Sequence, residues 1–168
     1  MAPKQLTREE LLLRYAEGER DFTGVYLKEV DLSNKILSRI ILAEANLERA
    51  NLTGTNFLGA NFRGAVLNQA RMYNCNLSGA NLVDTQLWRV DLRRAYLRGA
   101  NLTGAYMSEC DLSGANLGDA ILKLARLRDA NLTEVRWRGA DLTEADLRGA
   151  KLTGVDLTQV SLERALLL

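Results

Sequence analysis

Large apolar side chains return at every fifth position from Phe22 to Leu167, 30 times without an insertion. We call these positions centres; 24 of them are leucine, and the other six are Phe22, Phe57, Phe62, Met72, Met107 and Trp137. The residue two before a centre is usually alanine, and the residue one before it is often aspartate or asparagine. A period of five fits neither the 3.6-residue helix nor the two-residue strand, so neither element would keep the centres on one side.

A short extended piece followed by a corner resolves this conflict. In such a piece the alanine and the centre lie two residues apart and point inward together, while the residue between them points outward. Of the 13 glycines, 11 lie two residues after a centre, where a type II turn needs a positive φ. Asn34 and Asn74 tolerate that conformation, whereas Arg89 and Arg94 at the same position predict turns of another type. The pattern predicts a solenoid with a dry interior and coils about 4.8 Å apart.

The units ANLTG (100–104) and ADLRG (145–149) show the repeat most clearly. The pattern resembles the pentapeptide-repeat family over Phe22 to Leu167. This resemblance implies an all-β fold, a right-handed quadrilateral β-helix with four units per coil. Thirty units would then make about 7.5 coils and a rod about 36 Å long. We expect one structural domain, with a tail and capping helix at 1–19 and the β-helix at 20–168.

A helix is predicted over residues 8–17. Thr7 and Glu10 have the spacing of a capping box, and Gly18 can end the helix. The apolar residues of this helix that could cover the first coil are Leu11, Leu12 and Tyr15. We interpret it as an N-terminal cap that blocks edge-to-edge pairing, with a partner-binding helix as the alternative.

The C-terminal unit runs into three leucines, Leu166, Leu167 and Leu168. The resemblance implies that such ends can pair, and we expect a homodimer through the C-terminal coil; the alternative is a small exposed apolar end. Arg20 and Lys35 occupy inward positions, where a charge is costly unless it reaches solvent, so we expect distortion over 33–41. Trp137 at a centre predicts a core aromatic with a local bulge.

Composition excludes several chemistries. The chain has no histidine, which rules out imidazole-based triads. It has two cysteines, Cys75 and Cys110, both at inward positions about two coils apart, so we expect buried thiols and no disulfide. The outward Asp and Asn recur with the repeat, and hydrogen bonds to turn backbone explain them better than acid–base chemistry. We therefore expect no enzyme activity, no metal and no cofactor.

One outward cluster differs from the repeat background. Trp88 follows a centre directly and should lie outside. Its neighbours in the candidate protein-binding patch are Tyr73, Arg89, Arg93, Arg94, Tyr96 and Arg98. Exposed Trp with several Arg is typical of interface hot spots. The alternatives are arginine stems that cover a surface tryptophan, or contact with nucleic acid or anionic lipid.

The predicted function is a non-enzymatic protein-interaction scaffold that presents flat solenoid faces to a protein partner. The resemblance also implies an alternative function, that of a DNA mimic that modulates a type II topoisomerase. That mechanism needs a strongly negative surface, whereas the chain has 22 basic and 21 acidic residues and a basic middle. Because basic and acidic residues are nearly equal in number, we do not expect the chain to bind nucleic acid. No transmembrane segment and no secretory signal are recognisable, so we expect a cytoplasmic protein.

Overall fold

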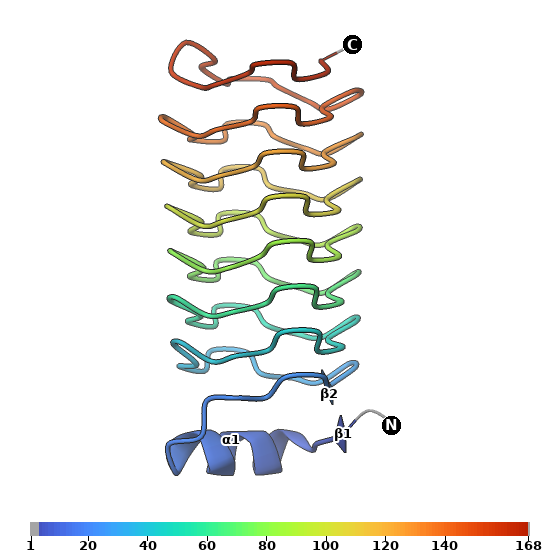
Figure 1. Ribbon diagram of the computed structural model, residues 1–168, viewed down its shortest axis with the longest axis vertical. Coiled ribbons are helices and arrows are strands. Elements are labelled where there is room, and N and C mark those ends of the chain that lie inside the picture. Colours follow the sequence, from blue (N-terminus) through green and yellow to red (C-terminus); the bar gives the residue numbers. More distant parts are fainter. Residues whose placement is uncertain (1–3, 168) are drawn as a thin grey trace.

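The computed structural model describes residues 4–167, and most of them form stacked coils (Figure 1). The regular elements are β1 (Lys4–Gln5), α1 (Arg8–Ala16) and β2 (Val25–Tyr26). Beyond them, outward residues form parallel β-bridges with the residue 20 positions later, from Asp21↔Ile41 to Asp146↔Leu166. Because each unit has five residues, a 20-residue coil has four sides. Every side is therefore a ladder of equivalent residues along the rod.

The interior is a continuous column of the predicted inward side chains. Leu52, Leu102 and Leu127 are completely buried, as are the alanines that precede the centres in the middle coils. Burying a leucine contributes about 1.5–3 kcal/mol. The buried hydroxyls of Thr55 and Thr85 donate to backbone oxygens of the coil below, at 2.7 and 2.9 Å. The column is thus apolar and its few polar atoms are satisfied.

The corners from Gly24 to Gly154 share one backbone conformation, which corrects the expectation for arginine corners. Arg89 and Arg94 have φ of 53° and 57°, close to the 65° of Gly99, so they make the same turn as glycine. The reason is the register between coils: the N–H of Arg94 donates to Ser113 O of the next coil at 3.0 Å. Repeating such bonds at each corner offsets the roughly 1–2 kcal/mol cost of a left-handed non-glycine residue.

The N-terminal segment covers the first coil. Thr7 and Glu10 form the predicted capping box of α1. Leu11 is completely buried, Leu12 and Tyr15 pack against the core, and the Tyr15 hydroxyl donates to Ser38 O at 2.9 Å. β1, which the sequence pattern did not reveal, pairs in parallel with β2 and extends the ladder of that side by one strand.

The predicted distortion over 33–41 is wrong. The bridges of this stretch are regular, and Asn34 and Leu37 donate their N–H groups to the next coil as elsewhere. Lys35 is only half-buried, which spares its charge most of the desolvation cost. Arg20 is exposed, with its guanidinium 4.0 Å from the Tyr15 ring centroid and bonded to backbone oxygens.

Trp137 produces the predicted bulge. Its indole is 2 % exposed, and its Nε1 donates to Asp156 O at 3.0 Å. Elsewhere on this side the backbone N–H of the centre makes that inter-coil bond, as Leu117 does to Arg136 O. At the next corner the inter-coil hydrogen bond is also shifted by one residue, since the Gly139 N–H donates to Gln159 O at 2.8 Å. The uppermost coil in Figure 1 accordingly departs from the outline of those beneath it.

The last coil is incompletely buried. Its centres Leu152, Leu157 and Leu162 are half-buried, and Leu166 and Leu167 are 48 % and 39 % exposed. Leu168, the third residue of the predicted dimer end, lies outside the described residues. The described part of this end therefore presents apolar side chains to solvent.

Candidate protein-interaction surface

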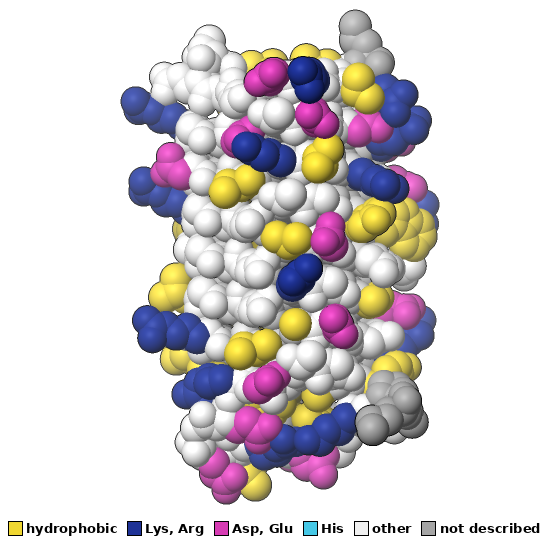
Figure 2. All heavy atoms as spheres, viewed as in Figure 1, with side chains coloured by type: hydrophobic (Ala, Val, Ile, Leu, Met, Phe, Trp, Pro, Cys, Tyr) yellow, Lys and Arg dark blue, Asp and Glu magenta, His cyan; other side chains and the backbone are white. Residues whose placement is uncertain are grey.

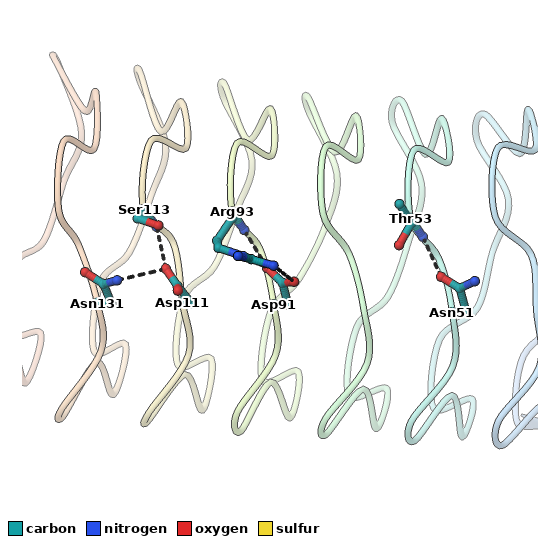
Figure 3. A network of polar contacts seen from close by, with 7 residues as sticks. All are labelled: Asn51, Thr53, Asp91, Arg93, Asp111, Ser113 and Asn131. Atoms are coloured by element: carbon teal, nitrogen blue, oxygen red, sulfur yellow. Dashed lines mark hydrogen bonds and ion pairs between the residues drawn. The ribbon is translucent and has the colours of Figure 1, made fainter.

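The outward Asp and Asn stabilise the turns, as expected. In each such unit the carboxylate or amide oxygen accepts a hydrogen bond from the backbone N–H two residues later, for example from Ser113 to Asp111 at 2.9 Å and from Thr53 to Asn51 at 3.3 Å (Figure 3). Asn131 also donates to Asp111 of the coil below at 3.1 Å. A role common to Asp and Asn needs no titration, so these carboxylates form part of the scaffold.

Trp88 and Arg89 form the first part of the predicted patch, on one edge of the rod. The indole is half-buried, and its Nε1 donates to Glu109 at 3.3 Å. Arg89 donates to the same carboxylate at 2.7 Å and lies 4.4 Å from the indole centroid. The hydrogen bonds from Arg89 and Trp88 lower the pKa of Glu109 below its ordinary value. We call Trp88, Arg89 and Glu109 the Trp88 ridge.

Arg93 and Tyr73 form the second part, on the next side. Arg93 holds Asp91 through two bonds of 2.8 Å (Figure 3), and its guanidinium lies 5.7 Å from the Tyr73 ring centroid. Burial alone would raise the pKa of Asp91, but the hydrogen bonds from Arg93 outweigh it and lower the pKa. This arginine is therefore committed to an intramolecular pair.

Arg94, Tyr96 and Arg98 form the third part, at the following corner and side. Tyr96 is 48 % exposed and shares a shallow surface hollow with Tyr73 and Arg94. Arg98 donates to Asp119 of the next coil at 3.1 and 3.3 Å. Successive units occupy successive sides, so the seven predicted residues wrap around the rod. The second and third parts meet in the hollow between Tyr73 and Tyr96, and no single side carries all seven.

Charge is mixed on the face in view in Figure 2, where acidic, basic and isolated apolar side chains alternate along the rod. Ion pairs also join adjacent coils of the rod, such as Lys28–Glu48 at 3.3 Å and Lys123–Asp141 at 3.2 Å. This face shows no block of one sign like the strongly negative surface of a DNA mimic.

The two cysteines lie in the interior of the coils. Cys75 and Cys110 are buried and unpaired, and burial raises the pKa of Cys75 to about 12. Within residues 4–167 no three His, Cys, Asp or Glu side chains come together as a metal site. In the same range, no helix has the length and apolar character needed to cross a membrane.

Sequence comparison settles the relationship that the period of five indicated. The family model for pentapeptide repeats (8 copies) matches overlapping segments that together extend over residues 21–159. The chain belongs to the pentapeptide-repeat family. Members form right-handed quadrilateral β-helices and are generally non-enzymatic structural or interaction modules.

Solved pentapeptide-repeat structures resemble the chain along most of its length. HetL, involved in heterocyst differentiation regulation in Nostoc sp. strain PCC 7120, is 28% identical over 96% of this chain and 93% of its own (TM-score 0.34). The protein alr5209 from Nostoc PCC 7120 is 26% identical over 96% and 98% (TM-score 0.37). QnrB1, a plasmid-mediated fluoroquinolone resistance protein, is 20% identical over 88% and 83% (TM-score 0.34). No curated protein matches the chain.

Proposed function

We propose that this pentapeptide-repeat protein is a non-enzymatic interaction module that presents the sides of its solenoid to a protein partner in the cytoplasm. The observation that carries the proposal is the inter-coil register, which fixes outward side chains at equal spacing on four rigid sides. A rigid display loses little conformational entropy on binding. About 7.5 coils, with α1 covering the first, make a rod about 36 Å long.

The Trp88 ridge is the proposed contact. Trp and Arg are enriched in interface hot spots, and both side chains here are already oriented by Glu109, which lowers the entropic cost of binding. If Glu109 only packs these two side chains on the surface, removal of Trp88 and Arg89 will leave partner recovery unchanged.

The test is recovery of partners from native cells with the tagged chain, identified by mass spectrometry. The double variant Trp88→Ala, Arg89→Gln should lose the specific partner, whereas Val83→Ala with Arg63→Gln, on another side of the rod, should keep it. Equal recovery by both variants would refute the ridge, and absence of any specific partner would refute the module. Inhibition of DNA supercoiling by the purified chain would instead support a topoisomerase modulator.

The apolar C-terminal coil is the proposed homodimer contact, because Leu166 and Leu167 remain exposed beside half-buried centres. Light scattering after size-exclusion chromatography should give twice the 18.7 kDa chain mass. The variant Leu166→Asp, Leu167→Asp should be monomeric, because two carboxylates cannot be buried in an apolar contact. A monomeric parent chain would refute the dimer.

A further inference from the structure

Two departures from the repeat meet on one side of the rod, the side whose upper centres are Leu97, Leu117 and Trp137. The first is Gly118, which follows a centre directly and lacks the positive φ of the corner glycines. The coils above and below place Arg138 and Arg98 at the equivalent position. Gly118 thus leaves a gap between two arginine side chains where a third side chain would otherwise stand.

The second departure is Trp137, one coil above Leu117. The indole donates to Asp156 O, and the N–H of Gly139 donates to Gln159 O. These hydrogen bonds change the register between coils at the upper end of the gap. A surface groove of about 480 Å³ lies at this place. We call it the Gly118 groove; its lining residues are Arg98, Asn116, Gly118, Asp119, Arg138, Gly139 and Gln159.

The groove carries excess positive charge. Arg98 shares an ion pair with Asp119, but both side chains are largely exposed, at 72% and 60%, and such pairs are weak. Arg138 at its rim and Arg136 beside it are exposed and form no ion pair with any residue between 4 and 167. The groove itself is therefore lined by two guanidinium groups, those of Arg98 and Arg138, and by one carboxylate, that of Asp119. Arg136 lies outside the lining, in a neighbouring hollow that also holds the carboxylates of Glu134 and Asp156.

We propose that the Gly118 groove binds the carboxylates of an acidic, extended segment of a protein partner, an inference that rests on the proposed interaction function. Guanidinium groups pair with carboxylates through two parallel hydrogen bonds. Arg98 and Arg138 are two coils apart, about 10 Å, and alternate carboxylates of an extended chain are about 6.6 Å apart. The long arginine stems can close that difference from both ends, and the gap at Gly118 leaves room for the peptide.

The length of the positive row favours a peptide over nucleic acid. Below Arg98 the outward residues of this side are uncharged, Asn76, Ser78, Asn56 and Leu58, until Arg39 at the corner of the first coil. A DNA duplex carries one charge per about 1.7 Å, and tight binders contact about 6–10 phosphates. The two arginines of the groove match two carboxylates.

The test is an NMR titration of the ¹⁵N-labelled full chain with the capped peptide acetyl-GSESESG-amide and its glutamine counterpart. The amide signals of Gly118 and Gly139 should shift with the glutamate peptide and stay in place with the glutamine peptide. Arg138→Gln should weaken the affinity about tenfold. Arg63→Gln, with the same charge change on another side, should leave it unchanged.

A second variant avoids any question of folding. Gly118 has an ordinary φ, and an added Cβ would approach only Asn116 Oδ1 closely, at 3.3 Å. Gly118→Glu should place a carboxylate between the arginines and abolish binding, whereas Gly118→Ser should keep it. Equal loss with Arg63→Gln, unmoved glycine signals, or stronger binding of a 12-base-pair DNA duplex at the same amides would overturn the proposal. If the peptide does not bind but partner recovery still depends on the Trp88 ridge, the groove proposal is refuted and the proposed interaction function is not.

Discussion

The two ends of the rod carry the same five-residue unit but differ in burial. In the first coil Leu32 and Leu37 are completely buried, because the next coil lies on one side and α1, with Leu11 inserted, lies on the other. In the last coil Leu157 and Leu162 have one stacked neighbour and remain half-buried. A unit therefore has little stability of its own and depends on what covers it, as in a one-dimensional stack.

The largest expected effect contrasts a middle centre with an end centre of the same side. Leu102→Ala should lower the free energy of unfolding by about 2–5 kcal/mol, because it leaves a cavity between two coils. Leu162→Ala should cost about 1 kcal/mol, because less area is lost from a half-buried side chain. Urea unfolding followed by circular dichroism measures both. Equal losses would mean that stacking neighbours do not determine the burial energy.

The next effect concerns the cover of the first coil. Leu11→Ala should cost about 2 kcal/mol or more and speed hydrogen exchange of the first coil, since its side chain fills the contact between α1 and the core. Leu13→Ala, on the same helix but 61% exposed, should change stability by less than about 0.5 kcal/mol. Unchanged exchange in the Leu11 variant would show that α1 is not a cover.

Corners separate backbone strain from burial, because a positive φ recurs at corners whose side chains differ in exposure. Leu124 has a φ of 60° and its side chain is 54% exposed. Leu124→Gly should raise stability by about 0.5 kcal/mol, the relief of strain less the added entropy of the unfolded chain. Gly99→Ala should lower it by about 1 kcal/mol, although its Cβ would meet no atom within 4 Å. Loss of stability in Leu124→Gly would contradict this ordering, and thermal unfolding measures both variants.

The smallest effect is the pH dependence near the last coil. Hydrogen bonds from the Arg148 side chain lower the pKa of Asp146 to about 2, against about 3.9 in an unfolded chain. A lowered pKa stabilises the fold above pH 4, and that contribution is lost as the pH falls towards 2. Asp146→Asn should flatten this part of the profile of unfolding free energy against pH. An unchanged slope would show that this pair does not contribute.

Most of the fold could be predicted because the repeat itself encodes it. The period of five places the leucines inside and the turns at fixed positions, and the capping box marks the start of α1. β1 has only two residues and no pattern, so sequence gave no sign of it. The left-handed arginine corners follow from the register between coils, which no single unit contains.

The candidate site was less predictable. Residues 88–98 are close in sequence, but every five residues the chain turns a corner onto the next side of the coil. Residues that are close in sequence therefore lie on different sides of the rod. The Gly118 groove arises from the opposite situation, because Leu117 and Trp137 are 20 residues apart and lie on adjacent coils of one side. Its sequence signal was an off-corner glycine and a tryptophan centre, which become neighbours only once the coil length is known.

Amide hydrogen exchange of the native chain, resolved by residue, tests most directly whether stacked neighbours create the stability of each coil. The N–H groups of Leu32 and Leu37, in the coil next to α1, should exchange nearly as slowly as that of Leu102 in the middle. The N–H groups of Val155 and Ala165 in the last coil should exchange much faster. Equal protection at the two ends, or rapid exchange throughout the first coil, would contradict this interpretation.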